Sequence, residues 1–235
     1  MFRRLVPLLL VLTALMVAAA AVYATTDQGG GGSEPPPAEP PPAELAPPGP
    51  APVPQFEAVR WRSSRAIGRP WAGRLVRGVR LPSEGADFFT WDPVLRGSPN
   101  RAWRRWGTNR LIRVVLRVLR AHRAAHSFAP RVGIGDISRP YGGNFGRRFG
   151  GIGHASHQNG LDVDIYYPRL DGLERRAGRV GQVDLELSQD LVDRFVAVGA
   201  EYVFVGPRTR LRGPRRRVVP LVHHDDHLHV RIRPR

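Results

Sequence analysis

The 235-residue sequence contains no cysteine, so it can form no disulfide bond and offers no thiolate to a metal ion. Any metal site must therefore be built from imidazole and carboxylate ligands. A folded domain of about 180 residues can bury enough surface to be stable without disulfide bonds. Apolar residues make up 42% of the chain, which is enough for a hydrophobic core.

Lysine is also absent, and every basic side chain other than histidine is arginine. The formal net charge at pH 7 is +16. A charge of this sign favours anionic partners, either nucleic acid or polymers of the cell envelope. For any single arginine, the alternative is a solvated side chain that reflects an arginine-rich genome composition.

The N-terminus has the pattern of an export signal. Arg3 and Arg4 precede an almost wholly apolar run from Leu5 to Val22, and small residues end at Ala24. Residues 1–24 are predicted to be a signal peptide, or a signal anchor, because the run approaches the ~20 residues that span a bilayer. The chain is then exported to the periplasm or cell envelope, free or tethered to the membrane, where anionic envelope polymers replace nucleic acid as the expected partners.

The remaining chain divides by composition into a linker and a domain. Residues 25–55 are rich in proline and glycine and predict an extended linker without a core of its own. Residues 56–235 are expected to form the folded domain. All five tryptophans lie between Phe56 and Gly107. We expect most of them to pack in the core rather than to form a ligand-contacting surface.

Hydrophobic periodicity predicts a mixture of helices and strands. Residues 109–126 carry the apolar stripe of an amphipathic helix, with Thr108 or Asn109 as its cap. A shorter helix is predicted from a cap at Ser188 to Gly199. Four strands are predicted, at residues 131–137, 161–167, 202–205 and 228–232. Because helices and strands do not alternate regularly, the expected class is α+β, with a small, mainly antiparallel sheet and flanking helices.

Histidines are concentrated in two short windows, which hold six of the eight in the chain. The first window is His-Ala-Ser-His-Gln-Asn-Gly-Leu-Asp-Val-Asp, from His154 to Asp164. The second is His-His-Asp-Asp-His-Leu-His-Val-Arg, from His223 to Arg231. Zinc is commonly bound by histidine nitrogen and carboxylate oxygen, and catalytic sites use three protein ligands and a water. Together the windows predict a metal site.

Residue spacing limits the ligands of this site without selecting them. His227 and His229 lie two residues apart on a predicted strand and therefore on one face, and the same holds for Asp162 and Asp164. A turn at Gly160 would bring the imidazole of His157 back beside Asp164. From spacing alone, either aspartate and either histidine can be the ligand. Taken alone, the Asp-x-Asp pair is equally compatible with a calcium site or a solvated face, and a single His-x-His pair is a weak signal of metal binding.

The motif His157-x-x-Gly160-x-Asp162-x-Asp164, followed by His227-x-His229, resembles the superfamily of lysostaphin-type peptidases, D-Ala-D-Ala peptidases and hedgehog domains. The fuller sequences of both windows are most similar to the penicillin-insensitive murein endopeptidase family. The resemblance covers residues 131 to 233, and it implies a hedgehog/D-Ala-D-Ala peptidase-like zinc peptidase core. Members of that family carry disulfide cysteines, which this chain lacks.

The resemblance also implies roles for individual residues. The zinc ligands it implies are His157, Asp164 and His229. His227 then becomes a catalytic residue rather than a ligand, His224 corresponds to a second active-site histidine, and His154 lies near the metal. Carboxylates that could orient these imidazoles through the second ring nitrogen are Asp162, Asp225 and Asp226.

The activity that the resemblance implies is that of a zinc-dependent murein DD-endopeptidase. Such an enzyme hydrolyses cross-links between peptidoglycan stem peptides, at the bond from D-alanine to a diamino acid. One of the two catalytic histidines would accept a proton from a zinc-activated water. Arg139 could meet a substrate carboxylate, and the six arginines of residues 208–217 could hold anionic polymer from a loop. A D-Ala-D-Ala carboxypeptidase and a non-catalytic, zinc-containing wall-binding module are the alternatives.

Overall fold

The computed structural model of the chain describes residues 54–146 and 154–234, which lie in one compact unit, Pro52–Arg235. The predicted signal segment at residues 1–24 and nearly all of the linker at 25–55 lie outside the described residues. Within the described part of the chain, no helix is long and apolar enough to cross a membrane.

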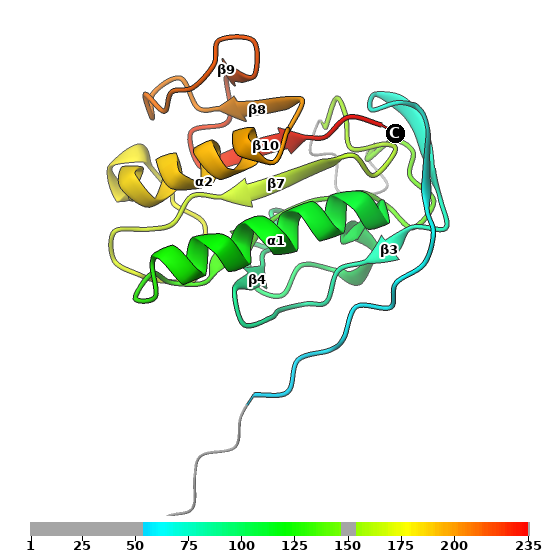
Figure 1. Cartoon of the computed structure of the whole chain (residues 1–235), viewed down its shortest axis with the longest axis horizontal. Coiled ribbons are helices and arrows are strands. Elements are labelled where there is room, and N and C mark those ends of the chain that lie inside the picture. Colours follow the sequence, from blue (N-terminus) through cyan, green and yellow to red (C-terminus); the bar gives the residue numbers. More distant parts are fainter. Residues whose placement is uncertain (1–53, 147–153, 235) are drawn as a thin grey trace, which may run out of the picture. The chain divides into compact units, whose positions relative to one another are not determined.

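A six-stranded sheet forms the centre of the domain, in the order β4-β6-β7-β10-β8-β9 (Figure 1). Its strands are β4 (Phe88–Thr90), β6 (Val132–Ile134), β7 (Asp162–Tyr166), β8 (Tyr202–Val205), β9 (Val218–Pro220) and β10 (His227–Arg231). The three inner pairings are antiparallel and the two outer ones are parallel. Two further antiparallel pairs join β1 (Arg65–Arg69) to β2 (Ala72–Val76) and β3 (Val79–Arg80) to β5 (Trp106–Gly107). The predicted α+β class with a mainly antiparallel sheet is confirmed.

The long amphipathic helix is present as predicted. Helix α1 spans Asn109–Ala125, and the Thr108 side chain caps it by accepting a hydrogen bond of 3.1 Å from the backbone N of Leu111. Its predicted apolar stripe is buried, at Leu111, Ile112, Val115, Val118 and Leu119. Together with α2 (Leu185–Ala197), this helix covers one face of the sheet (Figure 1).

Helix α2 (Leu185–Ala197) begins four residues earlier than predicted, so the prediction of a cap at Ser188 is wrong. Asp184 is the cap, and its Oδ1 accepts a hydrogen bond of 3.0 Å from the backbone N of Leu187. Ser188 lies inside the helix, where its hydroxyl donates back to the Asp184 carbonyl at 2.5 Å. Aspartate and serine are equally good caps, so composition alone does not separate them. Gly199, at φ +82°, follows the helix end.

The hydrophobic core fills the space between the sheet and the two helices. Val163 and Ile165 of β7 and Leu228 and Val230 of β10 are fully buried members of it. Side chains alternate along a strand, so the residues between these four point to the other face of the sheet. The same two strands therefore complete the core on one side and present polar side chains on the other.

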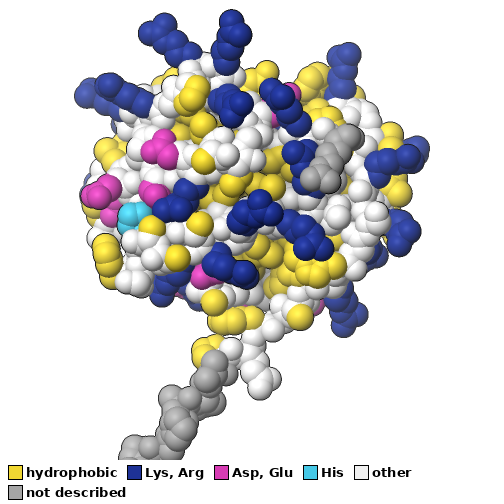
Figure 2. Space-filling view, viewed as in Figure 1, with side chains coloured by type: hydrophobic (Ala, Val, Ile, Leu, Met, Phe, Trp, Pro, Cys, Tyr) yellow, Lys and Arg dark blue, Asp and Glu magenta, His cyan; other side chains and the backbone are white. Residues whose placement is uncertain are grey.

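The expectation that most tryptophans pack in the core is wrong, since none of the five is buried. Trp61 and Trp71 are exposed, at 42% and 51%. Guanidinium groups cover some of the rings, with the Arg113 carbon 4.1 Å from the Trp61 ring centre. Arginines are spread over the helix-covered face of the domain rather than gathered in one patch (Figure 2).

Candidate metal centre

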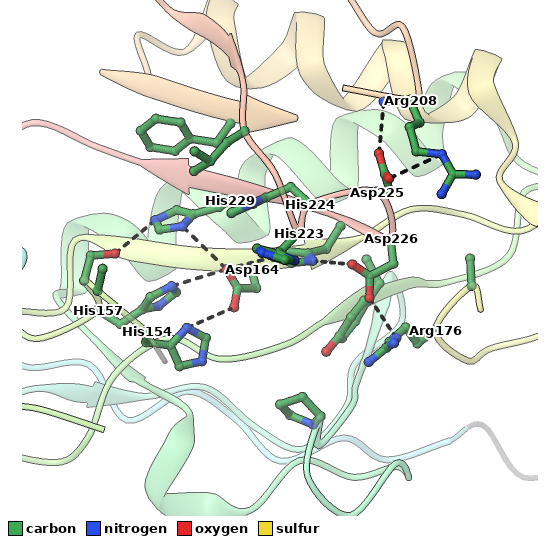
Figure 3. A pocket seen from close by; sticks show the side chains of 18 of the residues that line it. His154, His157, Asp164, Arg176, Arg208, His223, His224, Asp225, Asp226 and His229 are labelled. Atoms are coloured by element: carbon green, nitrogen blue, oxygen red, sulfur yellow. Dashed lines mark hydrogen bonds and ion pairs between the residues drawn. The ribbon is translucent and has the colours of Figure 1, made fainter. Parts of the chain in front are cut away.

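A cleft of about 760 Å³ lies on the side of the sheet opposite the helices, and both histidine windows line it (Figure 3). This volume is typical of small-molecule and peptide sites. The cleft is also bordered by Trp71 and Pro93 from the first part of the domain and by Arg176 and Arg208 from loops after β7 and β8.

The pairing of β7 with β10 determines which window residues meet. In this antiparallel register His229 lies opposite Asp164, and Arg231 lies opposite Asp162. His227 lies opposite Tyr166, one pair further along the same face. Side chains directly opposite each other on one face are in contact range. The register therefore brings the last histidine of the second window to the last aspartate of the first.

His157 reaches the same place from the loop before β7. Its backbone has φ 67°, in the left-handed region that non-glycine residues rarely adopt. Its Nδ1 donates a hydrogen bond of 2.8 Å to the Ile137 carbonyl. The other ring nitrogen, Nε2, lies 3.3 Å from Oδ1 of Asp164. Gly160 completes the turn at φ +74°, where a Cβ would come within 2.9 Å of Leu75.

Two atoms at this point are buried and have no hydrogen-bond partner, Nε2 of His157 and Oδ1 of Asp164. Buried polar atoms in folded proteins are nearly always paired, so these two call for a ligand. A tetrahedral zinc ion with bonds of about 2.0–2.1 Å places two ligand atoms about 3.3 Å apart. The observed separation is 3.3 Å. The residues present therefore fit a zinc ion.

His229 is held with one ring nitrogen toward Asp164. Its Nε2 donates to Oδ1 of Asp162 at 2.7 Å, and that oxygen also accepts from Nε of Arg231 at 2.7 Å. Nδ1 lies 3.9 Å from Oδ1 of Asp164. Burial lowers the pKa of His229 to about 4, which keeps the ring neutral. Asp162 thus bonds the back of the His229 imidazole through Oδ1, and its other oxygen, Oδ2, is buried without a hydrogen-bond partner.

His154 stands on the other side of Asp164. Together with His157 and Asp164 it forms a group whose ligand atoms all lie within 4.8 Å of one another. Its Nδ1 is 4.0 Å from Oδ2 of Asp164, and its Nε2 donates to Oδ2 of Asp136 at 2.7 Å. Asp136 is fully buried and is also paired with the buried guanidinium of Arg104.

The ionisable side chains of the cleft shift one another's pKa values. Burial raises the pKa of Asp164, but the positive charges of His157 and His227 outweigh burial and hold it well below the usual value. Burial lowers the pKa of His157, but Asp164 outweighs that effect and raises it to about 9. His157 and Asp164 therefore carry opposite charges, and a metal ion bound between them would displace the proton of His157.

His227 and His224 border the same point of the cleft. Nδ1 of His227 donates to Oδ1 of Asp226 at 2.8 Å, and Nε2 lies 3.8 Å from Oδ1 of Asp164. The second oxygen of Asp226 accepts from Nε of Arg176 at 2.7 Å. Nδ1 of His224 donates to the Val222 carbonyl at 2.8 Å, and its ring centre is 4.7 Å from that of His227. Each imidazole keeps its Nε2 available to the cleft.

Tyr167 braces the loop that carries these histidines. Its hydroxyl donates to the His224 carbonyl at 3.1 Å and accepts from the backbone N of Gly206 at 3.2 Å. Its backbone N donates to the Asp226 carbonyl at 3.2 Å. A buried tyrosine thus holds this loop in a chain without disulfide bonds.

Two predicted residues do not face an imidazole or the cleft centre. Asp225 lines the cleft, but its Oδ1 accepts from the backbone N of Arg208 at 3.0 Å. Arg139 does not line the cleft, and its guanidinium donates to the Asn144 carbonyl at 2.8 Å. Residues 147–153, in the glycine-rich stretch before the first window, lie outside the described residues.

The residues that sequence reasoning missed are those that hold the histidines from behind, namely Asp136, Arg104, Arg176 and Tyr167. Asp136 lies within the predicted strand at residues 131–137, and this position was its only signal. Arg104 and Arg176 look like the other arginines of the chain. Only their positions beside Asp136 and Asp226 distinguish them.

Comparison with known proteins gives one family. The sequence profile described as penicillin-insensitive murein endopeptidase matches residues 66–197, which is more than half of the chain. The match includes the first histidine window and ends before the second. The fold, the cleft and this sequence match together identify the chain as a peptidase. It belongs to the penicillin-insensitive murein endopeptidase family.

Curated relatives carry the same description. The chain is similar to the penicillin-insensitive murein endopeptidase of Yersinia enterocolitica, at 29% identity over 73% of this chain and 66% of the relative. It is 31% identical to that of Salmonella heidelberg, over 73% and 67% of the two chains. It is 27% identical to that of Haemophilus influenzae, over 71% and 62%. The chain thus spans about two thirds of the length of these relatives.

Proposed function

We propose that this chain is a zinc-dependent endopeptidase that hydrolyses peptide cross-links of peptidoglycan, at the bond between D-alanine and a diamino acid. The proposal is carried by the buried, unpaired Nε2 of His157 and Oδ1 of Asp164, with Nδ1 of His229 beside them in the wall of the cleft. The substrate comes from the description of the relatives, which names murein.

His157, Asp164 and His229 would hold the zinc ion. Two neutral imidazoles and one carboxylate leave such an ion with net positive charge. When bound, zinc supplies a Lewis acid that polarises the scissile carbonyl and acidifies a water molecule. Asp162 and the Ile137 carbonyl each accept a hydrogen bond from a ligand imidazole and so fix its tautomer and orientation.

His227 accepts the proton of the attacking water at Nε2. The carboxylate of Asp226, bonded to Nδ1, stabilises the imidazolium that results, and Arg176 keeps that carboxylate in place. Because Nδ1 of His224 donates to the Val222 carbonyl, this side chain would stabilise the developing oxyanion from Nε2 as an imidazolium, with both ring nitrogens protonated. This pair of imidazoles also argues against a wall-binding module without catalysis, which would not need two further histidines at the cleft.

The cleft lining suits a charged peptide. Arg176, Arg208 and Arg231 border it, and Trp71 adds an exposed aromatic surface. Guanidinium groups pair well with the carboxylates of stem peptides. The same guanidiniums could hold a free terminal carboxylate, which is the specific observation that favours a D-Ala-D-Ala carboxypeptidase as the second candidate.

Digestion of purified, cross-linked muropeptides with and without a chelator separates these candidates. Conversion of dimers to monomers that stops with chelator supports the endopeptidase. Release of terminal D-alanine from monomers, with dimers left intact, would support the carboxypeptidase instead. If neither product appears with zinc present, both enzyme proposals are wrong.

We also propose that the domain works outside the cytoplasm, with residues 1–24 as signal or anchor and 25–55 as a tether. Residues 208–217 form a loop with five exposed arginines that suits anionic envelope polymer, at Arg208, Arg210, Arg212, Arg215 and Arg216. Replacing these arginines by glutamine should weaken salt-sensitive binding to such a polymer. Unchanged binding would contradict this role.

A further inference from the structure

The two histidines outside the sequence windows form a cluster of their own. His122 lies in the last turn of α1, and His126 is the residue that ends this helix. Asp190 reaches them from α2. Ligand atoms of all three residues lie within 4.8 Å of one another. Both helices pack on the face of the sheet opposite the cleft, so this cluster is separate from the catalytic one.

The geometry of this cluster resembles that of the cleft. Residues four apart on a helix lie on the same side, and the two imidazole centres are 5.0 Å apart. Nε2 of His126 lies 3.4 Å from Oδ1 of Asp190. That separation is again close to the roughly 3.3 Å between two ligands of a tetrahedral zinc ion. Nε2 of His122 and Nε2 of His126 are buried and have no hydrogen-bond partner.

We propose that His122, His126 and Asp190 bind a second divalent cation of the zinc class, which links the end of α1 to α2. Two imidazoles and one carboxylate are a donor set that zinc prefers, and three ligands leave a position for water. The cluster sits at the C-terminal end of α1, where the helix dipole favours positive charge.

One neighbour limits how Asp190 can act. Arg194 and His122 both donate to Oδ2 of Asp190, at 2.5 and 2.6 Å. The other oxygen faces His126 and remains for the cation. The His122 side chain is 2% exposed, whereas those of His126 and Asp190 are 21% and 24% exposed, so a cation can enter from one side. A histidine reaches the surface beside acidic side chains on this helix-covered face (Figure 2).

The test uses the full chain with the cleft site disabled by His157→Ala and His229→Ala. Metal is first removed with a chelator, and the protein is then dialysed against zinc. This variant should bind about one zinc ion per chain. Adding His126→Ala should remove that ion. Cobalt in place of zinc should give the absorption bands of a tetrahedral site in the first variant and not in the second.

The matched control is His223→Ala in the same disabled background. His223 is an exposed histidine of the cleft loop, so its loss should leave the remaining zinc in place. If the disabled variant holds no zinc, or if His126→Ala keeps it, the proposed site does not exist. If His223→Ala removes it, the ion belongs to the cleft, and the proposal is again overturned. Circular dichroism checks the fold of each variant, and we expect His126→Ala to fold because His126 lies at a helix end with a partly exposed side chain.

Discussion

The two histidine–aspartate clusters use the same residue types on opposite faces of one sheet, yet their surroundings differ. In the cleft, Oδ1 of Asp164 has no hydrogen-bond donor and is approached by His157, His227 and His229. On the helical face, one oxygen of Asp190 is already paired with Arg194. A neutralising arginine suits a structural link, whereas a carboxylate oxygen that faces only imidazoles suits catalysis.

The scaffolds of the clusters differ as well. The cleft cluster stands mainly on paired strands, where every second side chain faces the site and its neighbours face the core. The helical cluster depends on a four-residue spacing within α1 and on the packing of α2 against it. The comparison therefore predicts strong chemical effects from changes in the cleft and only stability effects from changes between the helices.

The largest effect is expected from Asp164→Asn. Loss of the charged ligand should abolish muropeptide hydrolysis and remove the cleft zinc while leaving the proposed helical zinc in place. Zinc content and dimer cleavage are the measurements. Asp193→Asn, at an exposed position of α2, is the matched control. Full activity in Asp164→Asn would show that the cleft cluster is not the catalytic centre.

His227→Ala should show whether His227 is a zinc ligand or the general base. We expect kcat to fall by about 10²–10⁴-fold, the usual contribution of a general base, with the cleft zinc retained. His126→Ala serves as the matched histidine substitution in the other cluster. Loss of zinc together with activity would instead make His227 a ligand.

Asp162→Asn should have a smaller effect, on zinc affinity. Without the charged acceptor for Nε2 of His229, the imidazole is held less firmly, and affinity should fall by about 10–100-fold. A competition titration against a zinc indicator measures this change. An affinity equal to that of the unmodified chain would contradict the orienting role, and complete loss of zinc would make Asp162 itself a ligand.

The smallest effect on activity is expected from His126→Ala. Muropeptide hydrolysis should be unchanged, because the helical cluster lies across the sheet from the cleft. Zinc at about 100 times its dissociation constant would stabilise the folded state by about 2.7 kcal/mol through this site, and the variant should lose that gain. Thermal unfolding with the cleft site disabled measures the difference. Equal zinc stabilisation with and without His126 would remove the distinction between the clusters.

Local patterns predicted much of the fold. The 3.6-residue period over residues 109–126 predicted α1, with Thr108 or Asn109 as its cap, because both features depend on neighbours in sequence, and Thr108 is the cap observed. The predicted start of α2 was wrong, since Asp184 and Ser188 can both cap a helix and the choice between them depends on packing. The prediction that most tryptophans pack in the core was wrong, because a pattern of residue types does not show which rings stay partly exposed beneath arginines.

The residues behind the candidate site could not be predicted from sequence. Asp136 and Arg104 lie 32 positions apart and meet only because the chain segment after β6 passes the segment before β5. Arg176 reaches Asp226 from a loop 50 residues away (226 minus 176). Such pairs depend on the path of the chain, which residue type does not encode locally.

By itself, the sequence determined the chemistry of the candidate centre. Without cysteine, only imidazole and carboxylate remain as strong zinc ligands, and the two-residue spacings place each pair on one strand face. Tertiary structure alone decided which members of these pairs meet. The β7–β10 register sets Asp164 opposite His229 and Asp162 opposite Arg231. Register follows from burial of Val163, Ile165, Leu228 and Val230 against the helices, and this long-range packing cannot be derived from spacing.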